Sequence, residues 1–146
     1  MKIFVCLDEV GGMTFNKRRQ SSDCVIREDM LSEVGENFLY VNEYSAKQFT
    51  EESDRLIVTN DCLEMAGEQD YVFVENVKLD EYISKVEQII VYRWQRKYPA
   101  DFFFDVDLAD SEWDLLQTEE MQGNSHEMIL KEIYIKNKKI LVSKDA

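Results

Sequence analysis

Short apolar runs alternate with amphipathic segments along most of the chain. Runs rich in β-branched and aromatic residues predict buried strands. These runs cover 2–7, 38–41, 56–58, 71–74 and 88–92. Apolar residues at helical spacing predict the helices between them. These helices cover 24–33, 45–49, 61–66 and 79–86. Alternating strands and helices are typical of an α/β domain with a central, mainly parallel sheet flanked by helices.

The last third of the chain has a different pattern. Segments 113–121 and 127–136 contain alternating stretches separated by a polar turn at 122–126, which predicts a C-terminal antiparallel β-hairpin. Residues 138–142 predict a further edge strand whose lysines disfavour pairing with another chain. The sheet should therefore be mixed. We see no linker or repeat, so residues 1–146 are expected to form a single α/β domain.

The charge narrows the possible partners. The 146 residues include 30 acidic and 17 basic side chains, giving a net charge of −13. This acidic balance repels phosphate backbones and anionic lipids, so we expect neither general nucleic-acid binding nor membrane binding. No apolar run approaches the roughly 20 residues of a membrane span, and residues 1–15 do not resemble a signal peptide. A cytoplasmic protein is expected.

Metal-ligating residues are sparse. His126 is the single histidine, and the three cysteines show no CxxC spacing, which excludes a hydrolytic zinc site built from several imidazoles. We interpret His126 as a turn residue without chemistry. Segment 101–120 holds eight carboxylates and no Lys or Arg. Carboxylates could bind a hard cation, but a solvated acidic loop is favoured, and no metal site is predicted.

Two basic groups stand out against the acidic background. Guanidinium groups bind phosphates and carboxylates, and aromatic rings stack on planar ligands. The predicted ligand-binding residues are Lys17, Arg18, Arg19, Arg27, Arg93 and Trp94. The alternative is that these cations pair with the chain's own acids. No GxGxxG or GxxxxGK[ST] motif is present, so no cofactor is specified.

The last third also resembles dihydrofolate reductase in the order and spacing of its motifs. They are Phe104-Asp105, Ser111-Glu112-Trp113, the Asn124-Ser125-His126 turn and the final "EMILKEIYIK" strand. The resemblance implies a dihydrofolate reductase-like fold, with Asp23 nearest to the acid that would act as proton donor. Arg18-Arg19-Gln20 replaces the family's Leu-Pro-Trp. At the place of the family's Gly-Arg-x-Thr cofactor motif, this chain has Asn42-Glu43-Tyr44-Ser45. The Gly-Gly phosphate turn is missing.

The segments "FNKRRQSSD" and "YRWQRKYPADFFFD" are also similar to those of short bacterial sequences labelled ribonuclease Z. The residues do not support that activity. Ribonuclease Z holds two zinc ions with an HxHxDH motif, whereas this chain has one histidine.

Three hypotheses follow. The first is a protein that binds an anionic or planar small ligand through its basic residues, near strand ends where α/β sheets form crevices. The second is a nucleotide-dependent reductase with Asp23 as proton donor. The third is a non-catalytic interaction module. Whether the protein is an enzyme, which ligand it binds and its oligomeric state stay open.

Overall fold

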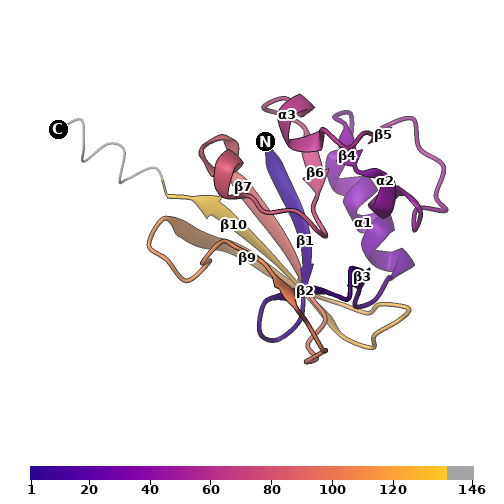
Figure 1. The fold of residues 1–146 in the computed structure, drawn as a ribbon, viewed down its shortest axis with the longest axis vertical. Coiled ribbons are helices and arrows are strands. Elements are labelled where there is room, and N and C mark those ends of the chain that lie inside the picture. The colour runs from indigo at the N-terminus through magenta and orange to yellow at the C-terminus, as the bar shows by residue number, and fades with distance from the viewer. Residues whose placement is uncertain (138–146) are drawn as a thin grey trace.

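A seven-stranded mixed sheet forms the centre of the computed structural model, which describes residues 1–137 (Figure 1). Its strand order is β5-β4-β6-β1-β7-β10-β9. The strands are β1 (Lys2–Leu7), β4 (Leu39–Val41), β5 (Leu56–Val58), β6 (Tyr71–Phe73), β7 (Gln88–Arg93), β9 (Trp113–Met121) and β10 (Ile129–Lys136). The five strands from β5 to β7 in this order run parallel. Strand β10 pairs antiparallel with β7, and β9 pairs antiparallel with β10. The predicted α/β fold and C-terminal hairpin are confirmed.

Strand β1 is buried on both faces. Ile3 and Val5 belong to one hydrophobic core, and Phe4 belongs to the other. All three side chains are fully inaccessible to solvent. Continuous burial of this kind is typical of central parallel strands, and it explains why the apolar run at 2–7 predicted the strand correctly.

Helix α1 (Cys24–Val34) packs on the Phe4 side of the sheet through Ile26, Met30 and Val34. Asp23 is its N-cap and accepts a hydrogen bond from the Val25 backbone. Gly35 follows with φ 58°, a conformation that favours glycine and ends the helix. The spacing of apolar residues in 24–33 therefore predicted this helix almost to its ends.

The other helical segments are shorter than the sequence suggested. They are α2 (Glu43–Ala46), α3 (Cys62–Met65) and the 3₁₀ helix η1 (Asp80–Lys85). Asn60 does not cap α3, as its spacing suggested, because its Oδ1 accepts a hydrogen bond from the Glu43 backbone. Tertiary contacts between loops here outweigh local capping preference. None of the helices in the described part of the chain is long and apolar enough to cross a membrane.

A second, three-stranded sheet was not predicted. It consists of β3 (Arg18–Arg19), β2 (Gly12–Phe15) and β8 (Phe102–Phe103), in that order. Asn16 and Lys17 join β2 to β3 with φ values of 49° and 63°. Two successive positive φ values characterise a type I′ turn, which matches the twist of a tight hairpin. The basic segment is thus the tip and second strand of a hairpin. Strands of two to four residues leave too little periodicity to recognise.

The C-terminal hairpin leaves β9 at one edge of the main sheet (Figure 1). Its pairing with β10 shifts register between Ile133 and Tyr134, which leaves Leu116 as a bulge between paired Leu115 and Gln117. The edge strand predicted for 138–142 lies outside the described residues.

Candidate functional site

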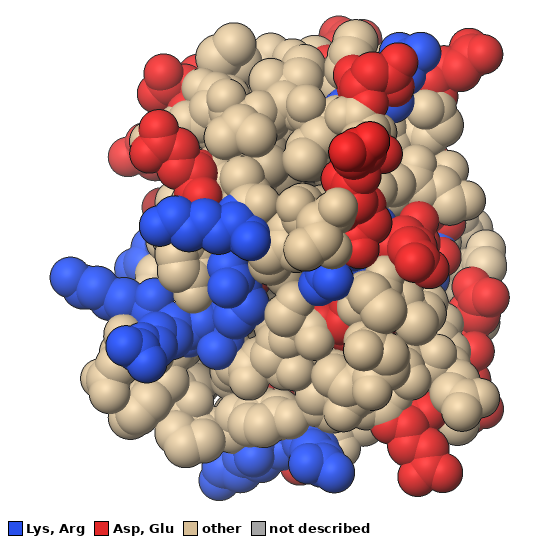
Figure 2. All heavy atoms as spheres, turned by 90° about the vertical axis from the view of Figure 1, so that its right-hand side faces the viewer, with Lys and Arg blue, Asp and Glu red and all other residues tan. Residues whose placement is uncertain are grey.

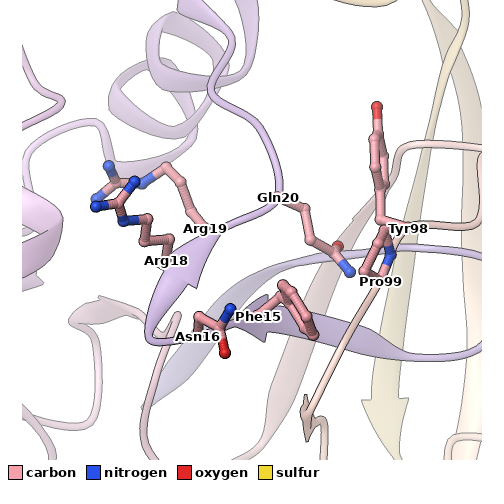
Figure 3. Close-up of a pocket in the computed structure, with 7 residues that line it drawn as sticks. All are labelled: Phe15, Asn16, Arg18, Arg19, Gln20, Tyr98 and Pro99. Atoms are coloured by element: carbon pink, nitrogen blue, oxygen red, sulfur yellow. The ribbon is translucent and has the colours of Figure 1, made fainter.

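A groove with a cavity volume of about 520 Å³ lies beside the β2–β3 hairpin. Its walls come from the hairpin and from the segment after β7. The lining residues are Phe15, Asn16, Arg18, Arg19, Gln20, Tyr98 and Pro99. Figure 3 shows the two arginine side chains extending to one side and Phe15, Tyr98 and Pro99 on the other. The groove therefore combines cationic and apolar walls.

Arg19 is held by a buried carboxylate. Its Nε lies 3.0 Å from Glu75 Oε2, and its Nη2 lies 3.2 Å from Glu75 Oε1. The guanidinium also stacks over the Tyr44 ring, 4.4 Å from its centroid. Glu75 Oε1 accepts further hydrogen bonds from Ser45 Oγ at 2.7 Å and Gln48 Nε2 at 2.9 Å. Arg19 thus neutralises Glu75 just beyond the carboxyl end of β6.

Arg27, Arg93 and Trp94 also have partners within the chain, and they do not line the groove. Arg27 Nε pairs with Glu51 Oε1 at 2.8 Å, and Arg93 pairs with Glu132. Trp94 is buried, and the centroid of its ring lies 4.6 Å from the centroid of the His126 ring. Of the six residues predicted to bind a ligand, the structure brings Arg18 and Arg19 together at the groove.

Arg18 differs from these arginines. It is exposed, and its guanidinium makes no hydrogen bond, ion pair or ring contact with any residue in 1–137. Lys17, the neighbouring turn residue, is exposed as well. Figure 2 shows the largest group of Lys and Arg side chains on one side of a face, with smaller basic groups at its lower and upper edges among acidic and uncharged residues. Arg18 is therefore a cation at the groove that the described chain does not neutralise.

Asp8, directly after β1, forms hydrogen bonds with the segments that line the groove. Its carboxylate accepts hydrogen bonds from the backbone of Gly12 at 2.7 Å and Tyr98 at 3.3 Å, and from Gln20 Nε2 at 2.9 Å. A Cβ on Gly12 would lie 2.7 Å from both Asp8 Oδ2 and Ala100 Cβ, so this position requires glycine. One buried carboxylate thereby links the hairpin to the segment of Tyr98.

Gln20 presents an unusual acceptor. Its Nε2 donates to Asp8, but its Oε1 is buried and, within residues 1–137, is the one buried side-chain N or O atom without a hydrogen-bond partner. Flipping the amide would place this oxygen against the Asp8 carboxylate. A buried acceptor without a partner typically costs about 1–3 kcal/mol, so a donor from a ligand or solvent would be favourable here.

Asp23 does not line the groove; it lies beneath the turn before β10. It is 2% exposed, and its Oδ2 accepts from Ser125 N at 2.8 Å and Ser125 Oγ at 2.7 Å. Burial alone would raise the pKa of Asp23, but the hydrogen bonds from Ser125, Asn124 and Val25 hold this pKa below its ordinary value. A carboxylate stabilised in this way is a poor proton donor.

A hydrogen-bond chain runs from Asp23 to the groove wall. Ser125 Oγ lies 2.7 Å from His126 Nδ1, and His126 Nε2 lies 2.5 Å from the Tyr98 hydroxyl. Because the Asp23 carboxylate can only accept, Ser125 donates to it and accepts from Nδ1–H of His126. Nε2 then accepts from Tyr98. His126 thus lies in the turn between β9 and β10, as predicted, but it is buried and hydrogen-bonded through both ring nitrogens.

The residues considered as metal ligands have structural contacts. Asp105 accepts hydrogen bonds from the backbone N–H groups of Leu79 and Asp80, and so it caps the start of η1. Within residues 1–137, no group of three His, Cys, Asp or Glu side chains has an arrangement that could hold a metal ion. All three cysteines are free thiols, and burial raises the pKa of Cys62 to about 11.

The fold is similar to that of dihydrofolate reductase from Enterococcus faecalis, solved in complex with NADP(H) and RAB-propyl, with a TM-score of 0.64. The similarity covers 93% of this chain and 95% of that chain at 12% sequence identity. No protein-family model and no curated protein sequence matches the chain. The comparison confirms the dihydrofolate reductase-like fold that the motifs of the last third implied.

Proposed function

We propose that the protein binds a small anionic ligand with a planar ring in the groove beside the β2–β3 hairpin. The observation that carries this proposal is the unpaired guanidinium of Arg18 at the groove, in a chain where Arg19, Arg27 and Arg93 are neutralised by carboxylates. A guanidinium without a carboxylate partner retains its capacity for bidentate bonds to phosphate or carboxylate.

The opposite wall supports a planar ring. Phe15 is 43% exposed, and Tyr98 and Pro99 complete an apolar surface on its side of the groove. The volume of about 520 Å³ lies within the range of roughly 300–1,000 Å³ that is common for small-molecule sites. Gln20 Oε1 is buried, so an N–H group on the ring would reach this acceptor after the Gln20 side chain turns toward the groove. The preferred ligand therefore combines an anion, a flat ring and a hydrogen-bond donor.

Isothermal titration calorimetry with three probes tests this combination. Adenosine 5′-monophosphate carries a ring, an amino donor and a phosphate, whereas adenosine lacks the anion and inorganic phosphate lacks the ring. We expect the monophosphate to bind at least about tenfold more tightly than either part, since one charge-assisted contact contributes about 1.5–3 kcal/mol. Equal binding of all three probes, or binding of none, would contradict the proposal.

A nucleotide-dependent reductase is the second candidate, and the similarity to a dihydrofolate reductase solved with NADP(H) favours it. This candidate assigns the proton donor to Asp23, whose lowered pKa opposes that role. The Arg19–Glu75 pair and Tyr44 also fill space at the strand ends. Titration with NADPH, followed by cofactor fluorescence, separates the candidates. A fluorescence change that Arg18→Gln leaves unaltered would favour the reductase.

A further inference from the structure

Strand β9 has an unpaired edge within residues 1–137. It contains nine residues, ends the strand order of the main sheet, and pairs with β10 on one side (Figure 1). The sheet edge opposite to it, β5, contains three residues. An unpaired strand edge presents backbone N–H and C=O groups that can pair with an added strand, and a long edge presents more of them.

The side chains of β9 are unusually open to solvent. Every residue from Asp114 to Glu120 is exposed, including Leu115 at 49% and Leu116 at 61%. The bulge at Leu116 interrupts the edge, so a straight added strand can follow the regular run Gln117–Met121. Leu115 and Leu116 then lie beside the end of that added strand. This part of the molecule lies apart from the groove, whose lining includes no residue of β9.

Charge selects the kind of strand that fits. Strand β9 carries Asp114, Glu119 and Glu120, and the whole segment 101–120 contains no Lys or Arg. Antiparallel pairing of two copies along 117–121 would bring these glutamates toward one another, which like-charge repulsion disfavours. A strand with Lys or Arg beside Glu119 and Glu120 would instead gain opposite-charge cross-strand pairs, each contributing about 0.2–1 kcal/mol.

We propose that the Gln117–Met121 edge binds an extended, lysine- or arginine-rich segment of a partner protein by strand addition. Backbone pairing supplies the affinity, and the two glutamates select the basic sequence. The exposed leucines favour apolar residues at the end of the bound segment. This surface is independent of the proposed ligand groove, so each proposal can fail without the other.

The probe is the acetylated and amidated heptapeptide Val-Thr-Val-Lys-Lys-Val-Thr, titrated into the ¹⁵N-labelled full chain; its two adjacent lysines face opposite sides of a strand, as Glu119 and Glu120 do. We expect amide shift changes centred on 117–121, and weaker binding at higher salt because the charge pairs are exposed. A second peptide carries N-methyl groups on alternate residues, along one backbone edge of the strand. A third peptide carries them on the remaining residues, along the other edge. Strand addition requires that one of the two methylated peptides fails to bind while the charge is unchanged.

Charge variants give the matched comparison. Glu119→Gln together with Glu120→Gln should weaken peptide binding about three- to tenfold, whereas Glu28→Gln together with Glu36→Gln, at exposed positions on α1 and just after it, should change it less than twofold. Equal binding of both methylated peptides would indicate charge attraction alone and overturn the proposal. The absence of amide shifts at 117–121 on addition of peptide would also overturn the proposal. Shifts at 117–121 that depend on protein concentration without peptide would indicate self-pairing and would overturn it as well.

Discussion

Arg19 and Glu75 form a two-pronged ion pair across the carboxyl end of the main sheet, with nitrogen–oxygen distances of 3.0 and 3.2 Å. The adjacent Arg18, one residue earlier on the same short strand, has no such partner in residues 1–137. The Arg18-Arg19 dipeptide therefore contains one structural and one available cation.

Replacing Arg19 with Ala should lower the free energy of unfolding by about 3 kcal/mol, because it leaves the Glu75 carboxylate buried without its countercharge. Urea denaturation at pH 7 measures the loss. Arg18→Gln is the control, and it should change stability by no more than about 0.5 kcal/mol. Equal effects of the two substitutions would show that the two arginines do not differ as the structure indicates.

Ser125→Ala should lower the free energy of unfolding by about 1–2 kcal/mol at pH 7, because Asp23 loses the hydroxyl donor at 2.7 Å. The lowered pKa of Asp23 stabilises the folded state above the unfolded pKa near 3.8, and this contribution is lost as the pH falls through the folded value. The two proteins should therefore converge in stability at acid pH. Ser32→Ala, at an exposed position of α1, serves as the control and should be near neutral.

His126 gives a direct NMR test, since it is the single histidine. Long-range ¹H–¹⁵N spectra at pH 7 should show the Nδ1–H tautomer. Burial and the Arg96 charge lower the pKa of His126 below 6.5, so folding stability should fall as the pH drops through this value. Tyr98→Phe removes the donor to Nε2 and should raise the pKa. An Nε2–H tautomer would refute the hydrogen-bond chain.

Lys17→Gly should stabilise the protein by about 0.5 kcal/mol. Lys17 has φ 63°, which costs an L-residue roughly 1–2 kcal/mol, while glycine adds an entropic cost of about 0.5–1 kcal/mol. Lys17→Ala removes the same charge but keeps the backbone strain, so it should give no gain. Thermal unfolding of the two variants decides the matter, and equal midpoints would argue against the type I′ turn.

The main sheet was predictable because its strands are buried and apolar. Ile3, Phe4 and Val5 form one uninterrupted run, and the alternation in β10 predicted the C-terminal hairpin. The β2–β3 hairpin was not predictable in this way. Its strands are short, and an Asn-Lys turn is a weaker signal than Asn-Gly.

The site was predictable only in part. Local charge density selected Arg18 and Arg19, which line the groove, together with Arg27 and Arg93, which do not, because sequence does not show which carboxylate lies opposite each arginine. Asp8 and Gln20 were missed, since their contacts join residues separated by 12 to 90 positions. The link between Tyr98 and His126 likewise depends on the fold.

Arg18 is the available cation of the groove in the proposed function. Calorimetric titration of adenosine 5′-monophosphate into wild type, Arg18→Gln and Arg27→Gln tests it most directly, because both variants lose one guanidinium and one positive charge. We expect Arg18→Gln to weaken binding about tenfold or more, and Arg27→Gln, which loses contacts with Glu51 and Ser22 away from the groove, to stay within about twofold of wild type. Equal affinities of the two variants, or a larger loss for Arg27→Gln, would contradict the claim.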